Sequence, residues 1–379
     1  MKISDKYDLI EERKVEELYS NGYLLRHKRS GARVFLLEND DENKVFYIGF
    51  RTPPPDSTGV PHIMEHSVLC GSKLFPAKDP FIELAKGSLN TFLNAMTYPD
   101  KTVYPVASCN DRDFKNLMHV YMDAVFAPNI YTREEIFCQE GWHYELSDPE
   151  GEVEINGVVY NEMKGAFSSP EDTIDRKMFE VLYPDTAYAR EAGGDPDHIP
   201  ELTYEAFLDF HRKYYHPSNS YIYIYGNCDM QERLEWLDSE YLRNYETIEV
   251  DSAPRLQKPL DTPAEKEIEY GITEEEETQD NTYIECSWVV DTVLNRELYL
   301  AFQIVDYVLL SAPGAPLKEK LLRSGICSDV MSSYENGVLQ PYFSIMIKNT
   351  NASEKERFVS MVRETLEEIV EKGVDKKSL

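Results

Sequence analysis

Apolar residues in the first third of the chain form short strand-like runs and longer stretches at helical spacing. Residues 23–27, 32–37 and 44–50 are apolar runs separated by turn residues, a pattern that predicts a β-meander. Residues 6–20 place apolar side chains at helical spacing, so we expect a short amphipathic helix there. Residues 111–126 repeat that spacing with larger side chains and predict a helix with a core face.

Capping signals mark where further helices begin. Asp79 followed by Pro80 opens a helix that we expect to reach about Leu93, and Thr132 with Glu135 forms a capping box for a helix through Trp142. The remaining elements expected in this part are helices at 158–167, 169–182, 203–214 and 230–244, and strands at 94–98, 102–106 and 221–225.

The pattern starts again after an acidic, proline-rich segment. The elements expected there are strands at 283–290, 330–334 and 342–347 and helices at 296–310, 317–323 and 353–371. The repetition predicts an α+β fold of two similar domains, each a mainly antiparallel sheet packed with helices. We expect a first domain at 1–248, a linker at 249–280 and a second domain at 281–379. Because 373–379 reads as a helix cap and the first turn of another helix, we expect the second domain to be incomplete at its C-terminus.

Composition describes an ordinary globular protein, with 42% hydrophobic and 28% charged residues. The N-terminal residues are charged and no run approaches 18 apolar residues, so we expect a cytoplasmic protein without a membrane partner. Six scattered cysteines fit reduced, largely buried thiols.

The net charge of -30 argues against a nucleic-acid partner, whose phosphates would be repelled. It is compatible with a basic ligand, although an acidic excess also serves solubility alone.

His62-Ile63-Met64-Glu65-His66 carries the clearest chemistry in the chain. Histidines four residues apart on a helix share one face, so both can reach one metal ion. Glu65 flanks that face and is placed to take a proton from water. A catalytic zinc ion needs a third protein ligand, which could be any downstream Asp, Glu, His or Cys. Spacing alone does not choose among Glu140, His143, Glu162 and several others.

Four blocks of sequence together resemble the presequence protease branch of the inverzincin (pitrilysin-type, M16) metallopeptidases. They are the H-x-x-E-H pentapeptide 62–66 and the segments 88–102, 140–145 and 157–165. The resemblance spans essentially the whole chain, and it implies a zinc-dependent endopeptidase that degrades unfolded oligopeptides.

The resemblance also implies roles for single residues. It gives His62, His66 and Glu162 as ligands of one Zn²⁺ ion per chain and Glu65 as the general base that takes a proton from the attacking water. An edge strand corresponding to Asn94, Ala95, Met96 and Thr97 would bind the peptide as an added strand.

Proteins of this branch are expected to have two homologous halves that enclose a chamber. The second, C-terminal half supplies an Arg and a Tyr. Only the first, zinc-bearing half is found in this chain, so we expect zinc binding with little or no activity without the C-terminal half. The expected substrates are unfolded peptides, among which the acidic charge favours basic ones. The alternatives are a non-catalytic scaffold of the same fold and a subunit that binds peptides without cleaving them.

Overall fold

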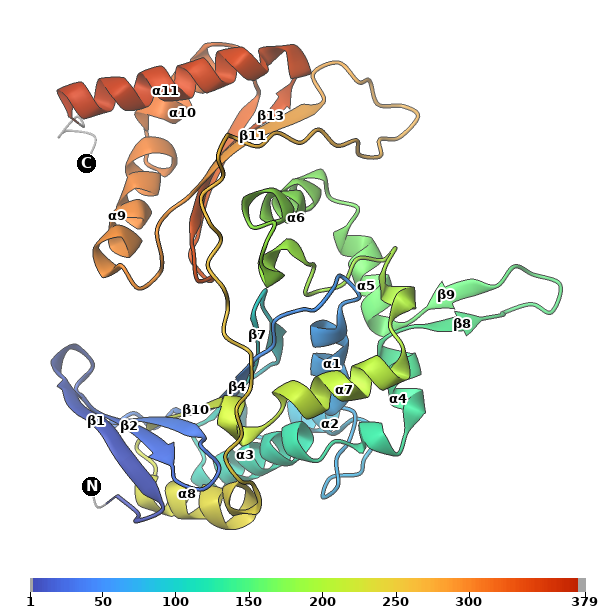
Figure 1. Ribbon diagram of the computed structural model, residues 1–379, viewed down its shortest axis with the longest axis vertical. Helices are drawn as coiled ribbons and strands as arrows, with labels where there is room; N and C mark the ends of the chain where they lie inside the picture. Colours follow the sequence, from blue (N-terminus) through green and yellow to red (C-terminus); the bar gives the residue numbers. More distant parts are fainter. Residues whose placement is uncertain (1–2, 374–379) are drawn as a thin grey trace. The chain divides into compact units, whose positions relative to one another are not determined.

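The computed structural model describes residues 3–373, which divide into two compact units. Unit 1 holds the chain up to Gly165 together with Arg190–Ala253, and unit 2 holds Ala166–Ala189 together with the chain from Pro254 onward. The chain therefore leaves unit 1 after Gly165 and returns to it at Arg190. Figure 1 follows this path by colour.

Unit 1 is built on one mixed sheet with the strand order β1-β2-β3-β10-β4-β7-β5, and β6 also pairs with β7. Only β3 and β10 run parallel, and the other pairs are antiparallel. The strands are β1 (Tyr7–Val15), β2 (Ser20–His27), β3 (Arg33–Glu38), β4 (Lys44–Arg51), β5 (Asn90–Leu93), β6 (Met96–Thr97), β7 (Lys101–Ser108) and β10 (Ser220–Gly226).

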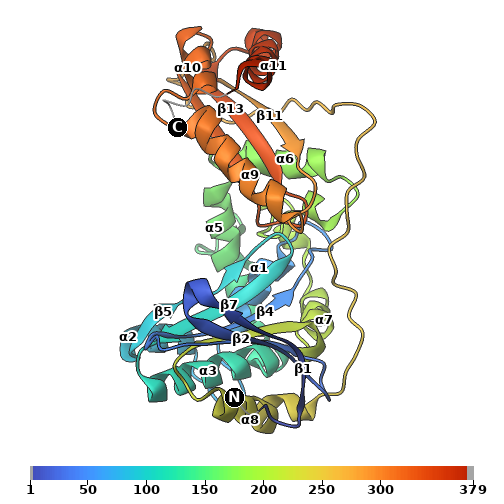
Figure 2. The ribbon, with the colours of Figure 1, turned by 90° about the vertical axis from the view of Figure 1, so that its left-hand side faces the viewer.

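The sheet buries one face against helices, as the alternation along β10 shows. Ile222 and Ile224 are buried, whereas the three tyrosines that alternate with them are half-buried on the other face. The long helix α3 (Asp111–Phe126) packs on β4 and β7 through its apolar side (Figure 2). This packing places the core of unit 1 between the sheet and its helices.

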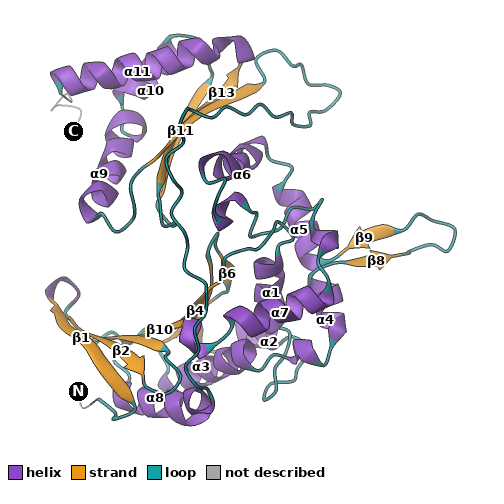
Figure 3. Cartoon of the chain, viewed as in Figure 1, coloured by secondary structure: helices purple, strands orange, loops and turns teal. Residues whose placement is uncertain are grey.

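The other regular elements of unit 1 are short. Its helices are α1 (Val60–Val68), α2 (Pro80–Gly87), α4 (Glu134–Glu140), α5 (Val158–Ala166), α7 (Tyr204–Tyr214) and α8 (Met230–Trp236), which continues as a π-helix and a 3-10 turn to Asn244. A separate two-stranded hairpin, β8 (His143–Glu145) with β9 (Glu154–Asn156), joins α4 to α5 (Figure 3).

Two of the predicted helices are wrong. Most of the segment 6–20 is the edge strand β1, followed by a 3-10 turn at Glu16–Leu18, because pairing with the apolar strand β2 outweighs the local helical spacing. The helix that begins at Pro80 ends at Gly87, where the backbone turns extended, and β5 then pairs with β7. The neighbouring strand thus decides the conformation of residues 90–93.

The capping box predicted at Thr132 is also wrong. Helix α4 begins after Arg133, and no side chain caps it. The helices expected from 169 and 203 are confirmed, and Ser169 and Thr203 cap them, because each side chain accepts a hydrogen bond from a backbone N–H in the first turn of its helix.

Unit 2 contains a three-stranded antiparallel sheet in the order β11-β13-β12. Its strands are β11 (Thr282–Val289), β12 (Asp329–Glu335) and β13 (Tyr342–Thr350), and its helices are α6 (Pro170–Leu182), α9 (Arg296–Asp306), α10 (Pro316–Arg323) and α11 (Lys355–Lys372). Apolar residues from β12, β13, α10 and α11 form one core, with Leu317, Ile345 and Phe358 fully buried. With sheets and helices in both units, the expected α+β class is confirmed.

The two compact units differ from the predicted domains in one respect. Residues 166–189, which carry α6, belong to unit 2 although they lie inside the predicted first domain. The described residues between Asn244 and Thr282 include no helix or strand, and the boundary between the units falls within them, at Ala253. The final turn expected at 373–379 lies almost entirely outside the described residues.

One apolar stretch of unit 2, Arg296–Arg323, is long and apolar enough to cross a membrane by length and composition alone, a test that core helices also pass. The stretch breaks at Pro313-Gly314, where Gly314 has a φ of 77°. Leu309 and Leu310 before the break pack in the core of unit 2, as do Leu317 and Leu321 after it. Only 22% of the apolar window is buried, and Leu300 and Ile304 on α9 are exposed, so core packing explains only part of its apolar character. The absence of a membrane partner stays a prediction.

Glu285 on β11 is a destabilising group that we expect to limit the stability of unit 2 at neutral pH. Burial and the nearby charge of Asp175 raise its pKa to about 7 from 4.5. A carboxyl group whose pKa is higher in the folded than in the unfolded state stabilises the fold at pH values below its unfolded pKa. That stabilisation is lost as the pH rises through the folded pKa of about 7. Glu285→Gln should therefore be near neutral at pH 4.5 and stabilising by about 2–3 kcal/mol above pH 7.

Calorimetric unfolding at several pH values checks this expectation. Glu367→Gln, at an exposed position on α11, is the matched control and should change little at any pH. A Glu285→Gln effect that does not grow between pH 4.5 and 8 would contradict the assignment.

Candidate metal centre

His62 and His66 extend from one side of α1, four residues apart, with ring centroids 4.9 Å apart. The residue just before the helix, Gly59, has a φ of 71°. A Cβ at this glycine would lie 2.6 Å from the Cα of Gly194, so only glycine lets the two backbones approach. This close contact brings the 193–194 turn beside the first turn of α1.

Each histidine has a second partner that fixes the orientation of its ring. Nδ1 of His62 lies 3.0 Å from the carbonyl oxygen of Gly193, and Nδ1 of His66 lies 3.3 Å from Oε2 of Glu140. Because a carbonyl or carboxylate oxygen only accepts, each Nδ1 carries the proton and each Nε2 keeps a free lone pair. Such partners are typical of histidines that bind metals through the other nitrogen.

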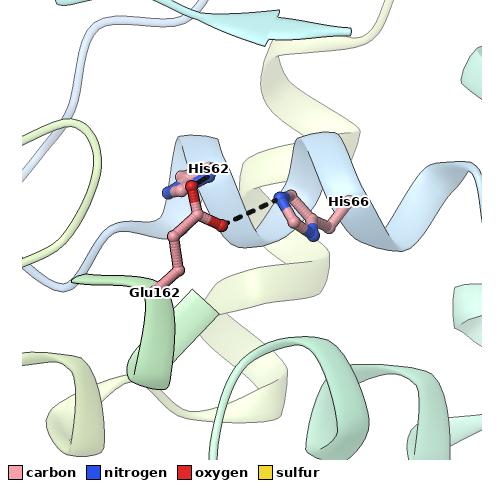
Figure 4. Close-up of side chains that lie close together, drawn as sticks. All are labelled: His62, His66 and Glu162. Atoms are coloured by element: carbon pink, nitrogen blue, oxygen red, sulfur yellow. Dashed lines mark ion pairs between the residues drawn. The ribbon is translucent and has the colours of Figure 1, made fainter. Parts of the chain in front are cut away.

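The third side chain, Glu162, comes from α5. Its Oε1 lies 3.8 Å from Nε2 of His62, and its Oε2 lies 3.8 Å from Nε2 of His66. Figure 4 shows the carboxylate directed toward the two rings. A Cβ at Gly157, just before α5, would lie 2.1 Å from the carbonyl oxygen of Gly141, which ends α4. Glycine at 157 therefore lets α5 begin against the end of α4, the helix that carries Glu140.

These three side chains fit a zinc ion. Two imidazole nitrogens and one carboxylate are a common donor set for catalytic zinc, and one candidate ligand atom from each residue lies within 4.8 Å of the others. Zinc bonds of about 2.0–2.1 Å in a tetrahedral site separate ligand atoms by roughly 3.3 Å, so a small closing movement suffices. The exposed fractions of 12% for His62, 25% for His66 and 54% for Glu162 leave the group open to solvent.

Glu65 lies on the same helix as the histidines but is buried, with 7% of its surface exposed. Its Oε2 accepts a hydrogen bond of 2.9 Å from Oγ1 of Thr97. Burial raises the pKa of Glu65, and the charges of His66 and His62 oppose that rise. The hydrogen bond to Thr97 ties this carboxylate to the edge of the sheet.

Residues 94–97, the predicted peptide-binding strand, lie at that edge. Met96 and Thr97 form β6 and pair with β7 on one side. The hydroxyl of Tyr121 on α3 donates to the carbonyl oxygen of Asn94, which holds the start of the segment. The structure thus brings this strand next to Glu65, and its role in binding peptides stays a prediction.

The other two residues that spacing left open as ligands have different surroundings. Oε2 of Glu140 lies 3.3 Å from Nδ1 of His66. Burial acts to raise the pKa of the Glu140 carboxyl group, but its hydrogen bonds, first of all the one with His66, hold that pKa below its usual value. His143 lies in the hairpin, with Nδ1 2.8 Å from the carbonyl oxygen of Cys138, outside the metal group. The thiol of Cys70 donates to Oε1 of Glu140, and burial raises its pKa.

Sequence reasoning did not find two supporting groups, the backbone carbonyl of Gly193 and the hydroxyl of Thr97 as a partner of Glu65. Every residue has a backbone carbonyl, so the sequence cannot single out the one at Gly193. The pair Gly193-Gly194 is the available signal, because glycines allow two backbones to lie close together. The sequence predicts Thr97 only as part of the peptide-binding strand.

Two family models match the chain. Residues 45–148 match the insulinase (peptidase family M16) model, and residues 201–379 match the peptidase M16 inactive domain model. His62, Glu65 and His66 fall within the first match, whereas Glu162 lies between the two.

Curated relatives align with nearly the whole chain. It is 50% identical over 370 residues to Protein HypA of Clostridium perfringens, covering 98% of this chain and 38% of the relative. It is 42% identical over 373 residues to presequence protease 1, chloroplastic/mitochondrial, of Arabidopsis thaliana, covering 97% and 34%. The chain thus spans little more than a third of the length of these relatives.

Solved structures share the fold at low identity. The crystal structure of pitrilysin aligns with a TM-score of 0.68 and 17% identity, over 99% of this chain and 39% of that one. A putative M16-like peptidase from Alicyclobacillus acidocaldarius aligns with a TM-score of 0.65 and 15% identity, over 95% and 81%. These structures show the fold alone. The family models and the relatives show that the chain belongs to the M16 peptidase family, as a presequence-protease-like member.

Proposed function

We propose that this chain is the metal-bearing part of a zinc-dependent endopeptidase that cleaves unfolded peptides. The observation that carries the proposal is the convergence of His62, His66 and Glu162 from two helices, with both Nε2 atoms directed toward the carboxylate. Membership in a peptidase family and similarity to presequence proteases support it. Zinc bound by these three side chains would polarise a carbonyl group and lower the pKa of water.

The residues around this group have distinct tasks in the proposal. The carbonyl of Gly193 and the carboxylate of Glu140 keep Nε2 of each histidine available. Glu65 takes a proton from the attacking water at its Oε1, because Oε2 is engaged by Thr97, and passes the proton to the leaving amine. Strand β6 binds the peptide backbone, which lets side chains of many kinds be accepted. The remaining part of the longer protein would complete the site.

Removing the carboxylate ligand should abolish tight zinc binding. Purified wild-type protein should contain about one zinc ion per chain, and Glu162→Gln should lose most of it, because a neutral amide oxygen is a poor replacement for a carboxylate. Elemental analysis after dialysis measures the content. Equal zinc in both proteins would exclude Glu162 as a ligand. No zinc in either protein, even after zinc is added, would leave the scaffold alternative standing.

Glu140 should affect zinc affinity without being a ligand. Glu140→Ala leaves Nδ1 of His66 without its acceptor and should weaken zinc binding about 10–100-fold. Glu140→Gln should recover part of the loss, because the amide oxygen still accepts. Competition with a chromophoric chelator measures both affinities, and an unchanged affinity in Glu140→Ala would show that the hydrogen bond has no part in binding.

Glu65→Gln should separate metal binding from catalysis. The variant should retain zinc, because Glu65 is not a ligand, and should lose cleavage by a factor of about 10²–10⁴. Mass spectrometry of an unstructured peptide after long incubation with excess protein detects the products. If the wild-type protein yields detectable products, formation of the same products at an equal rate by Glu65→Gln would exclude this carboxylate as the base.

A further inference from the structure

The hairpin β8–β9 has one apolar face and one acidic face, and both are open to solvent. It projects from unit 1 between α4 and α5 (Figure 1). Tyr144 pairs directly with Ile155, so these two side chains share one face. Leu146 and Val153 follow immediately toward the tip. The exposed fractions of Tyr144, Leu146 and Val153 are 69%, 53% and 61%.

The base of the apolar face is attached to the body of unit 1 through Trp142. Trp142 donates from its indole N–H to the carbonyl oxygen of Leu202 in the body of unit 1, and its ring contacts Tyr144 edge-on with centroids 5.4 Å apart. Apolar residues on one face of a two-stranded ribbon normally pack on a core, because an isolated hairpin is at best marginally stable. No such cover lies over the outer part of this ribbon in the described residues.

The opposite face and the tip carry only negative charge. Residues 143–156 include no lysine or arginine, and their five acidic residues are Glu145, Asp148, Glu150, Glu152 and Glu154. Among the described residues, none of the five forms an ion pair. Glu145 and Glu154 are directly opposite each other across the strands, an arrangement that is unfavourable without a cation.

We propose that this hairpin is a docking site for extended peptide segments in which apolar and basic residues alternate. β8 and β9 pair only with each other, so each has an outer edge that is unpaired within the two-stranded sheet. A peptide added along either edge sends alternate side chains to opposite faces. Its apolar side chains then cover the Tyr144 face, and its lysines or arginines reach the carboxylates on the other face.

Charge decides between this occupant and a second copy of the chain. Two hairpins of this composition would place like charges together, in a protein with a net charge of -30. A basic segment instead gains attraction at the acidic face and covers apolar surface at the other. The site lies outside the metal group, so the proposal does not depend on hydrolysis.

Binding of short synthetic peptides to the zinc-loaded Glu65→Gln protein tests the docking site without cleavage of the probe. The first peptide alternates lysine and valine. The second has the same composition, with all its lysines before its valines, and the third alternates glutamate and valine. Fluorescence anisotropy should show the tightest binding for the first peptide, a loss of about tenfold for the second and no measurable binding of the third.

Two sets of variants locate the site. Tyr144→Ser with Leu146→Ser removes apolar surface, and Glu145→Gln with Glu154→Gln removes the opposed charges. Each should weaken binding of the first peptide about tenfold while zinc content is unchanged. Leu18→Ser with Glu17→Gln, at exposed positions of the Glu16–Leu18 turn, is the matched control and should bind as the parent does.

Parental affinity in both hairpin variants, or equal affinity for the alternating and block peptides, would overturn the proposal. A dimer in sedimentation velocity that the hairpin variants abolish would do so as well, because the occupant would then be a second copy. Zinc content and cleavage are measured separately, so failure of the docking site and failure of the proposed function are distinguishable.

Discussion

Two hydrogen bonds decide whether the three candidate ligands can act together. The carbonyl of Gly193 and the carboxylate of Glu140 each occupy Nδ1 of one histidine, so that both Nε2 atoms are directed toward Glu162. If either ring turned over, the carbon atom Cε1 would take the place of Nε2 and the donor set would be lost. The four-residue spacing on α1 places both histidines on one face, and these two acceptors orient the rings so that both Nε2 atoms can bind one metal ion.

The acceptors are held in place by close backbone contacts at two glycines. Gly59 allows the 193–194 turn to touch the start of α1, and Gly157 allows α5 to begin against the end of α4. The supporting carboxylate Glu140 and the ligand Glu162 therefore come from helices that meet at their ends, although 22 residues separate them in sequence. Most of that separation is the hairpin, which extends outward and leaves the two helices in contact at its base.

Much of the fold follows from local pattern, and the failures share one cause. Long periodic segments such as α3 and strongly capped helices such as α6 and α7 form where the sequence predicts them, because their signals lie within the element. β1 and β5 were predicted as helix because their own spacing permits a helix, and only pairing with β2 and β7 makes them strands. Likewise the assignment of residues 166–189 to unit 2 depends on distant packing that no local pattern encodes.

The H-x-x-E-H pentapeptide indicates a metal site by itself, whereas the choice among Glu140, His143 and Glu162 needed the resemblance to a family. Zinc K-edge X-ray absorption of the loaded protein tests directly whether His62, His66 and Glu162 bind the metal together. Coordination by these three residues predicts two imidazole ligands with nitrogen and oxygen donors at about 2.0–2.1 Å and no sulfur in the coordination shell. A sulfur ligand, a single imidazole, or failure to take up zinc would contradict it.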